Sequence, residues 1–192
     1  MSAEAVPQPP PVFESHRDDA RPTTWDDLQT IPDDHFRYEL LDGVLLVSPA
    51  PGTAHLIALT GVFRLLDAAA PGDLLVGVAP YDFTWRETTS LEPDVFVVRL
   101  ADLGEKRATV PPLLAVEVVS PSSRRLDRGS KRLAYEEFGV PAYWIVDPEA
   151  RSIQVLELQD GAYVERALLT GDDELTVERP FPVTLTCSLF DR

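Results

Sequence analysis

Two acidic residues stand in segments that otherwise have the pattern of buried β-strands. Asp94 follows Pro93 and opens the apolar run at 95–98, and Glu117, 23 residues further along, interrupts the apolar run at 113–119. A carboxylate in a buried strand is costly unless it is paired, protonated or bound to a cation. Two such carboxylates at the ends of adjacent core strands therefore predict a site for a divalent metal ion.

Magnesium suits this pair because it prefers oxygen ligands, keeps several waters and needs only one or two carboxylates. The expected ligands are Asp94, Glu117 and the backbone carbonyl oxygen of Val118, and Mn²⁺ can substitute for Mg²⁺. Such an ion polarises a phosphoryl oxygen and lowers the pKa of its water, so the pattern favours phosphodiester hydrolysis. Each acid also has a structural alternative. Asp94 can cap a turn, and Glu117 can pair with Arg124 or Lys131.

A basic segment follows the second acid. Between residues 124 and 132 a single acid, Asp127, is accompanied by five basic residues: Arg124, Arg125, Arg128, Lys131 and Arg132. The four arginines could position a phosphate backbone, a contact that carries no sequence information by itself. The alternative is a solvated helix surface. The formal net charge of −15 argues against a nucleic-acid partner, although this local cluster softens the objection.

The elements around these residues predict one mixed α/β domain over 21–192, preceded by a flexible tail at 1–20 that contains four prolines. A hairpin is expected at 38–48, because Asp42-Gly43 is a tight-turn dipeptide. Thr53 is expected to cap a helix to about residue 70, with one apolar face formed by Leu56, Leu59, Phe63, Leu66 and Ala70. Further strands are expected at 74–79, 81–85, 143–148, 152–158 and 163–169, with a β-like stretch at 175–190.

A second long helix is predicted at 127–138, ended by Gly139. Three- and four-residue spacing places five side chains on one face of it: Asp127, Lys131, Ala134, Tyr135 and Phe138. Ala134 and Phe138 suit the core, so Lys131 should point toward the sheet, where a long side chain could reach the acids. Leu133, on the opposite face, leaves open that the helix is buried on both sides.

The order and spacing of several short motifs resemble the Uma2 family of bacterial proteins, members of the PD-(D/E)xK nuclease superfamily. The resemblance runs from about Thr24 to Phe190. It is carried by the residues at 38–43, 48–51, 93–94, 116–123 and 139–148, together with His55, Asp127 and Lys131.

This resemblance implies a restriction-endonuclease-like core, with a central mixed sheet flanked by helices and extra antiparallel hairpins. It implies a Mg²⁺-dependent endonuclease acting on DNA, in which Asp94, Glu117 and Lys131 are catalytic. The superfamily pattern places a lysine two residues after the second acid, where this chain has Val119. Lys131 is therefore expected to act as a migrated catalytic lysine.

Four further residues are expected to have auxiliary roles. Glu39 would lie near the metal, or else be a surface carboxylate of the hairpin. His55 would contact phosphate or act as a general base, although a lone histidine there is more often structural. Ser120 could contact phosphate or serve as an ordinary loop residue, and Asp127 shares the helix face of Lys131.

We expect a cytoplasmic protein without a membrane span, because the longest apolar stretches are strand-length and residues 1–11 lack the features of a secretory signal. The single Cys187 cannot form an intrachain disulfide. Nucleases of this fold that cut two strands as dimers suggest a homodimer by analogy. The competing hypothesis is a catalytically silent nuclease-fold protein that binds a partner or oligomerises. The net acidity and Val119 both favour it.

Overall fold

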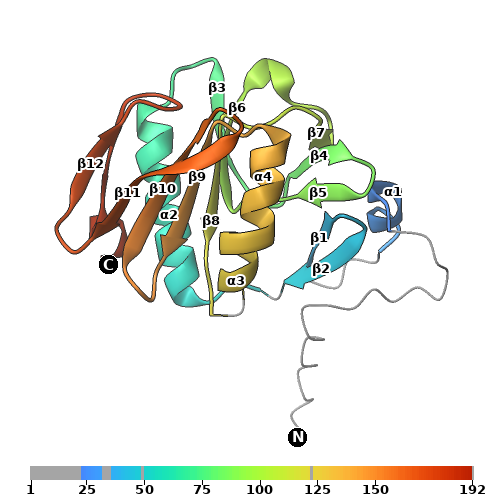
Figure 1. Ribbon diagram of the computed structural model, residues 1–192, viewed down its shortest axis with the longest axis horizontal. Coiled ribbons are helices and arrows are strands. Elements are labelled where there is room, and N and C mark those ends of the chain that lie inside the picture. The colour runs from blue at the N-terminus through green and yellow to red at the C-terminus, as the bar shows by residue number, and fades with distance from the viewer. Residues whose placement is uncertain (1–22, 32–35, 49, 122, 192) are drawn as a thin grey trace, which may run out of the picture.

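Most strands of the computed structural model lie in two sheets (Figure 1). The structure describes residues 23–31, 36–48, 50–121 and 123–191, so the tail predicted at 1–20 lies outside the described residues. The strands are β1 (Arg37–Leu41), β2 (Val44–Ser48), β3 (Leu74–Val78), β4 (Asp82–Arg86), β5 (Thr89–Leu91), β6 (Val95–Arg99), β7 (Arg107–Ala108), β8 (Leu114–Val118), β9 (Ala142–Asp147), β10 (Ser152–Gln159), β11 (Ala162–Thr170), β12 (Glu174–Val177) and β13 (Val183–Thr186).

The larger sheet is mixed and has six strands in the order β11-β10-β9-β8-β6-β3. Strands β8 and β9 are parallel, whereas the other neighbours pair antiparallel. A five-stranded sheet has the order β2-β1-β5-β4-β7, and β12 pairs with β13 in a separate hairpin. The expected fold class, a central mixed sheet flanked by helices with extra antiparallel hairpins, is confirmed.

Helices cover both faces of the six-stranded sheet (Figure 1). The helix α2 (Thr53–Ala69) packs on one face. A continuous helical segment packs on the other face and consists of α3 (Arg124–Leu126), a π-helical turn (Asp127–Lys131) and α4 (Arg132–Phe138). The short α1 (Trp25–Leu28) starts at Thr24 with a capping box. Within the described ranges, no helix has both the length and the apolar character needed to cross a bilayer.

The start and the buried face of α2 differ from the prediction. Gly52, and not Thr53, is the N-cap, and it makes no side-chain capping hydrogen bond. Of the predicted face, Leu66 is buried and Leu59, Phe63 and Ala70 pack against the core, whereas Leu56 is 49% exposed. The fully buried line also includes Ala58 and Val62, which were not predicted. Apolar residues surround most of this helix, so spacing alone does not select the buried face and packing against the sheet decides it.

The second helical segment starts three residues earlier than predicted and contains a π-helical turn. Such turns accommodate an extra residue and occur often at functional sites. The turn spans the two residues that face the acids, Asp127 and Lys131, and both are buried. Leu133 is 60% exposed, so the segment is buried on one side only. Gly139 ends it with a φ of 83°, as predicted.

Substitution of two glycines tests whether the helical segment needs a left-handed residue at its end. Gly139→Ala should lower the free energy of unfolding by about 1–2 kcal/mol, because an alanine is strained at this positive φ even though open space surrounds the site. Gly129→Ala is the matched control. Gly129 lies in the helical turn with equally open surroundings, so alanine there should be neutral or raise stability by up to about 1 kcal/mol. Urea unfolding of both variants measures the difference, and equal effects would contradict the left-handed role of Gly139.

Candidate functional site

Asp94 and Glu117 lie side by side where β6 and β8 pair. Val95 is opposite Val116 in this antiparallel ladder, so Asp94 and Glu117 are the next residues along it. The backbone N–H of Val118 donates to Oδ2 of Asp94 at 2.8 Å. Both acids are buried, and Glu117 is only 1% exposed. The prediction that two acids occupy the ends of adjacent core strands is confirmed.

The Lys131 side chain reaches the acids from the π-helical turn. Its Nζ donates to Oε1 and Oε2 of Glu39 at 2.8 Å each and to Oε1 of Glu117 at 3.1 Å. Oδ1 of Asp127 is 4.0 Å away. The hydroxyl of Tyr135 donates to the same Glu117 oxygen at 2.8 Å. The predicted direction of Lys131 is therefore confirmed, and the ion pair considered as the structural alternative for Glu117 is present.

Strand β1 brings two charged side chains from the five-stranded sheet. Residues two apart on a strand share a face, so Arg37 and Glu39 point the same way. Glu39 is 1% exposed and accepts the backbone N–H of Glu92 at 2.9 Å, which rules out a surface hairpin carboxylate. Arg37 Nη1 donates to Oδ1 of Asp94 at 2.6 Å, and its Nη2 lies 3.5 Å from Oε2 of Glu39.

Sequence reasoning did not identify Arg37 as a site residue. The available signal was the Arg37-x-Glu39 spacing in a strand, which puts opposite charges on one face of a hairpin. That signal is weak, because exposed hairpins carry the same pattern.

Four acids and two cations form the buried cluster: Glu39, Asp94, Glu117 and Asp127 with Arg37 and Lys131. Burial raises the pKa of Glu117 well above its usual value, although Lys131 opposes this rise. Burial also raises the pKa of Asp127 to about 6 and that of Glu92 to about 8. For Glu39, burial alone would raise the pKa, but Lys131, Arg37 and the hydrogen bonds that Glu39 accepts together lower it. Burial thus favours the protonated forms of Glu117 and Glu92, and the cluster has more carboxyl groups than its two cations can pair with.

This excess of carboxylates fits a divalent cation. Asp94, Glu117 and the Val118 carbonyl supply the oxygen ligands that Mg²⁺ prefers. Among the residues that the structure describes, no group of three or more His, Cys, Asp or Glu side chains is arranged to hold a metal. A magnesium site with two carboxylates and several waters is smaller than such a group. In the structure, Arg37 and Lys131 occupy oxygens of these two acids.

His55, from the first turn of α2, adjoins the acid pair. Its Nε2 lies 3.7 Å from Oδ2 of Asp94. Burial lowers the pKa of His55 below its usual value despite the nearby Asp94, so the ring is mainly neutral at pH 7. Ser120 lies in the loop before α3, where its backbone N–H donates to Oγ of Ser123 at 3.0 Å. This bond matches the loop role considered as the alternative for Ser120.

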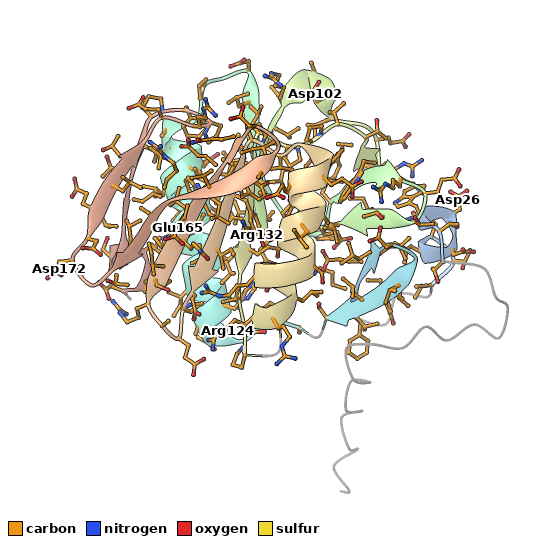
Figure 2. All side chains as sticks on the ribbon, in the orientation of Figure 1. Asp26, Asp102, Arg124, Arg132, Glu165 and Asp172 are labelled. Carbon is orange, nitrogen blue, oxygen red and sulfur yellow. The ribbon has the colours of Figure 1, made fainter. Side chains whose placement is uncertain are left out.

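The arginines of the helical segment for which partners are found contact residues outside this cluster. Figure 2 shows Arg124 at one end of the segment and Arg132 further along it. Arg124 pairs with Asp147 and Glu149, and Arg128 with Asp147. Arg132 donates to the backbone carbonyl of β11 at Tyr163. For Arg125 we find no hydrogen bond or ion pair with a described residue. Binding of nucleic acid by these arginines stays a prediction.

Asp127 should make the stability of the protein depend on pH. Its pKa is about 6 in the folded state against 3.8 for an unperturbed aspartate, so the native state binds more protons and stability falls as the pH rises through this window. Asp127→Asn should therefore raise the free energy of unfolding by about 1–3 kcal/mol at pH 7 and change little below about pH 4. Urea unfolding at both pH values measures this.

The matched control for Asp127 is Asp160→Asn. Asp160 is exposed in a tight turn with a φ of 50°, a conformation that asparagine tolerates. No stabilisation is expected for this control at either pH. A gain for Asp127→Asn that is as large at pH 4 as at pH 7 would contradict the assigned titration.

The chain was compared with known proteins. No curated protein matches it. The crystal structure of a protein from Anabaena variabilis, described as "a putative nuclease belonging to DUF820", is similar with a TM-score of 0.72 and 17% sequence identity, over 88% of this chain and 97% of that chain. At this identity the likeness establishes the fold. A family model described as "Uma2: Putative restriction endonuclease" matches residues 25–189, and the chain therefore belongs to the Uma2 family.

Proposed function

We propose that the protein is a metal-dependent endonuclease that hydrolyses phosphodiester bonds in DNA. The observation that carries the proposal is that Asp94, Glu117 and Lys131 lie close together in the interior. They come from two adjacent strands and from the helical segment packed on them. The family description, "Putative restriction endonuclease", and that of the related crystal structure, "a putative nuclease", both support this class of reaction.

Asp94, Glu117 and the carbonyl of Val118 would hold Mg²⁺, or Mn²⁺ in its place. When bound, the ion would supply Lewis acidity toward a phosphoryl oxygen and would make a water molecule more acidic. The surplus of carboxylates in the cluster supports this assignment, because a cation would offset the repulsion among them.

Lys131 would act through its positive charge. Burial disfavours its protonated form, but Glu117 and Glu39 outweigh burial and raise its pKa, so it keeps its proton and is unsuited to be a general base. A fixed ammonium stabilises the negative charge that develops on phosphorus oxygens in the transition state. Glu39 holds this ammonium with both oxygens, independently of Glu117.

In the proposed reaction, a water oxygen forms a bond to phosphorus as the bond from phosphorus to the leaving ester oxygen breaks. Neutral His55, whose Nε2 lies 3.7 Å from Asp94, would accept the proton of the water, and the leaving oxygen would take a proton from solvent. The products are a phosphate monoester end and an alcohol end.

The alternative function is a catalytically silent nuclease-fold protein that binds a partner. Two observations favour it. Val119 occupies the usual lysine position, and Arg37 and Lys131 already neutralise part of the charge of Asp94 and Glu117.

The metal site is tested by calorimetric titration of Mn²⁺ and Mg²⁺ into the wild type and into Asp94→Asn. Saturable binding is expected in the wild type and should weaken at least about tenfold in the variant, because a ligand oxygen with full charge is lost. Asp67→Asn, an exposed position on α2, is the control and should bind like the wild type. If the wild type binds neither ion, both without DNA and with DNA present, the metal-dependent proposal is wrong.

Glu117→Gln separates the nuclease from the silent scaffold. Because burial disfavours the ionised Glu117, the neutral amide should raise the free energy of unfolding by about 1 kcal/mol or more. The same change should abolish metal binding and hydrolysis of bis(p-nitrophenyl) phosphate, a substrate without sequence preference. Thermal unfolding, calorimetry and the hydrolysis assay measure the three effects. A stabilised variant that keeps every activity of the wild type would favour the scaffold.

A further inference from the structure

Arg37 occupies a position that differs from that of Lys131 in its access to solvent. The side chain of Arg37 is 24% exposed, whereas that of Lys131 is 2% exposed. All three donors that an ammonium offers are matched by contacts of Lys131 with Glu39 and Glu117. Of the two buried-cluster cations, Arg37 is therefore the one that an incoming ligand can reach.

The guanidinium of Arg37 is incompletely satisfied. Its Nη1 is held by Asp94 and its Nη2 contacts Glu39 at the longer distance of 3.5 Å. Its buried Nε has no hydrogen-bond partner in the part of the chain that the structure describes. A buried donor without an acceptor costs free energy, so the present partners satisfy the guanidinium incompletely. The exposed part of the side chain is where a ligand could supply further acceptors.

A phosphodiester fits these free donors. The planar guanidinium carries five N–H groups in a fork that matches two oxygens of a phosphate, and it stays charged at every physiological pH. Arg37 also lies directly beside Asp94, so a phosphate at this fork would adjoin the acid pair.

We infer that Arg37 is a catalytic residue that binds the non-bridging oxygens of the reacting phosphodiester and, without substrate, serves as the counter-ion of Asp94. The inference rests on the proposed nuclease function. The guanidinium and a divalent cation compete for the same Asp94 carboxylate. The negative charge of a phosphodiester at the guanidinium would offset its positive charge and so weaken this competition. This coupling makes metal affinity higher with a phosphodiester present than without it.

Arg37→Met should raise the affinity for Mn²⁺ and lower the rate of hydrolysis, a combination that is not expected of a purely structural residue. Mn²⁺ affinity without nucleic acid should rise at least about fivefold, because a competing cation leaves Asp94. Hydrolysis of bis(p-nitrophenyl) phosphate at saturating Mn²⁺ should fall about 10²- to 10³-fold. With a chelator present to remove metal ions, binding of a short mixed-sequence DNA duplex should weaken. The slope of the logarithm of the binding constant against the logarithm of the salt concentration should decrease in magnitude by about one.

Two further variants complete the experiment. Arg37→Lys keeps the charge but loses the fork, so its Mn²⁺ affinity should stay near that of the wild type while hydrolysis falls at least about tenfold. This variant decides the matter if Arg37→Met fails to fold. Arg166→Met is the control, since Arg166 is exposed on β11, and it should change none of the three measurements.

The outcomes separate this inference from the proposed function. A wild type that neither binds Mn²⁺ nor hydrolyses the diester overturns both. An active wild type with Arg37 variants that lose metal affinity and hydrolysis in parallel, or that hydrolyse normally, overturns only the role of Arg37.

Discussion

The ion pair of Lys131 with Glu39 and Glu117 joins the three parts of the fold that meet at the site. Glu39 comes from the five-stranded sheet, Glu117 from the six-stranded sheet and Lys131 from the helical segment. Loss of Lys131 would leave the buried carboxylate of Glu39 uncompensated, and such a charge costs about 3–5 kcal/mol. The arrangement of sheets and helix therefore depends on matched charges as well as on apolar packing, and this dependence keeps the carboxylates within reach of one another.

The same cluster is not optimised for stability. Among the residues that the structure describes, the buried acids of the cluster outnumber its cations, and burial raises the pKa of Glu117, Glu92 and Asp127. Ordinary cores avoid such groups, whereas functional sites retain them at a cost in stability. Arg37 and Lys131 act as internal counter-ions that make the cluster tolerable, and a bound cation would complete the neutralisation. The site thus lacks positive charge relative to its carboxyl groups, and a bound cation would supply it.

Sequence reasoning identified the acid pair because burying a charge is costly wherever it occurs, so an acid inside an apolar run is informative by itself. It also gave the direction of Lys131, since helical spacing places that residue on the face of Ala134. It left Glu39 undecided and did not identify Arg37. Both belong to β1, and only the contacts of Arg37 with Asp94 and of Glu39 with Lys131 show that this face of the hairpin lies against the cluster.

Local rules determined the elements of this protein. The Asp42-Gly43 turn, the end of the helix at Gly139 and the apolar strands all follow from interactions within a few residues. The tertiary structure alone decided the π-helical turn, the buried face of α2 and the contact between Arg37 and Asp94. These features depend on which elements pack together, and residues 57 positions apart share no local signal in the sequence. The residue types therefore determined which chemical groups are available at the site, and long-range packing determined how these groups are arranged.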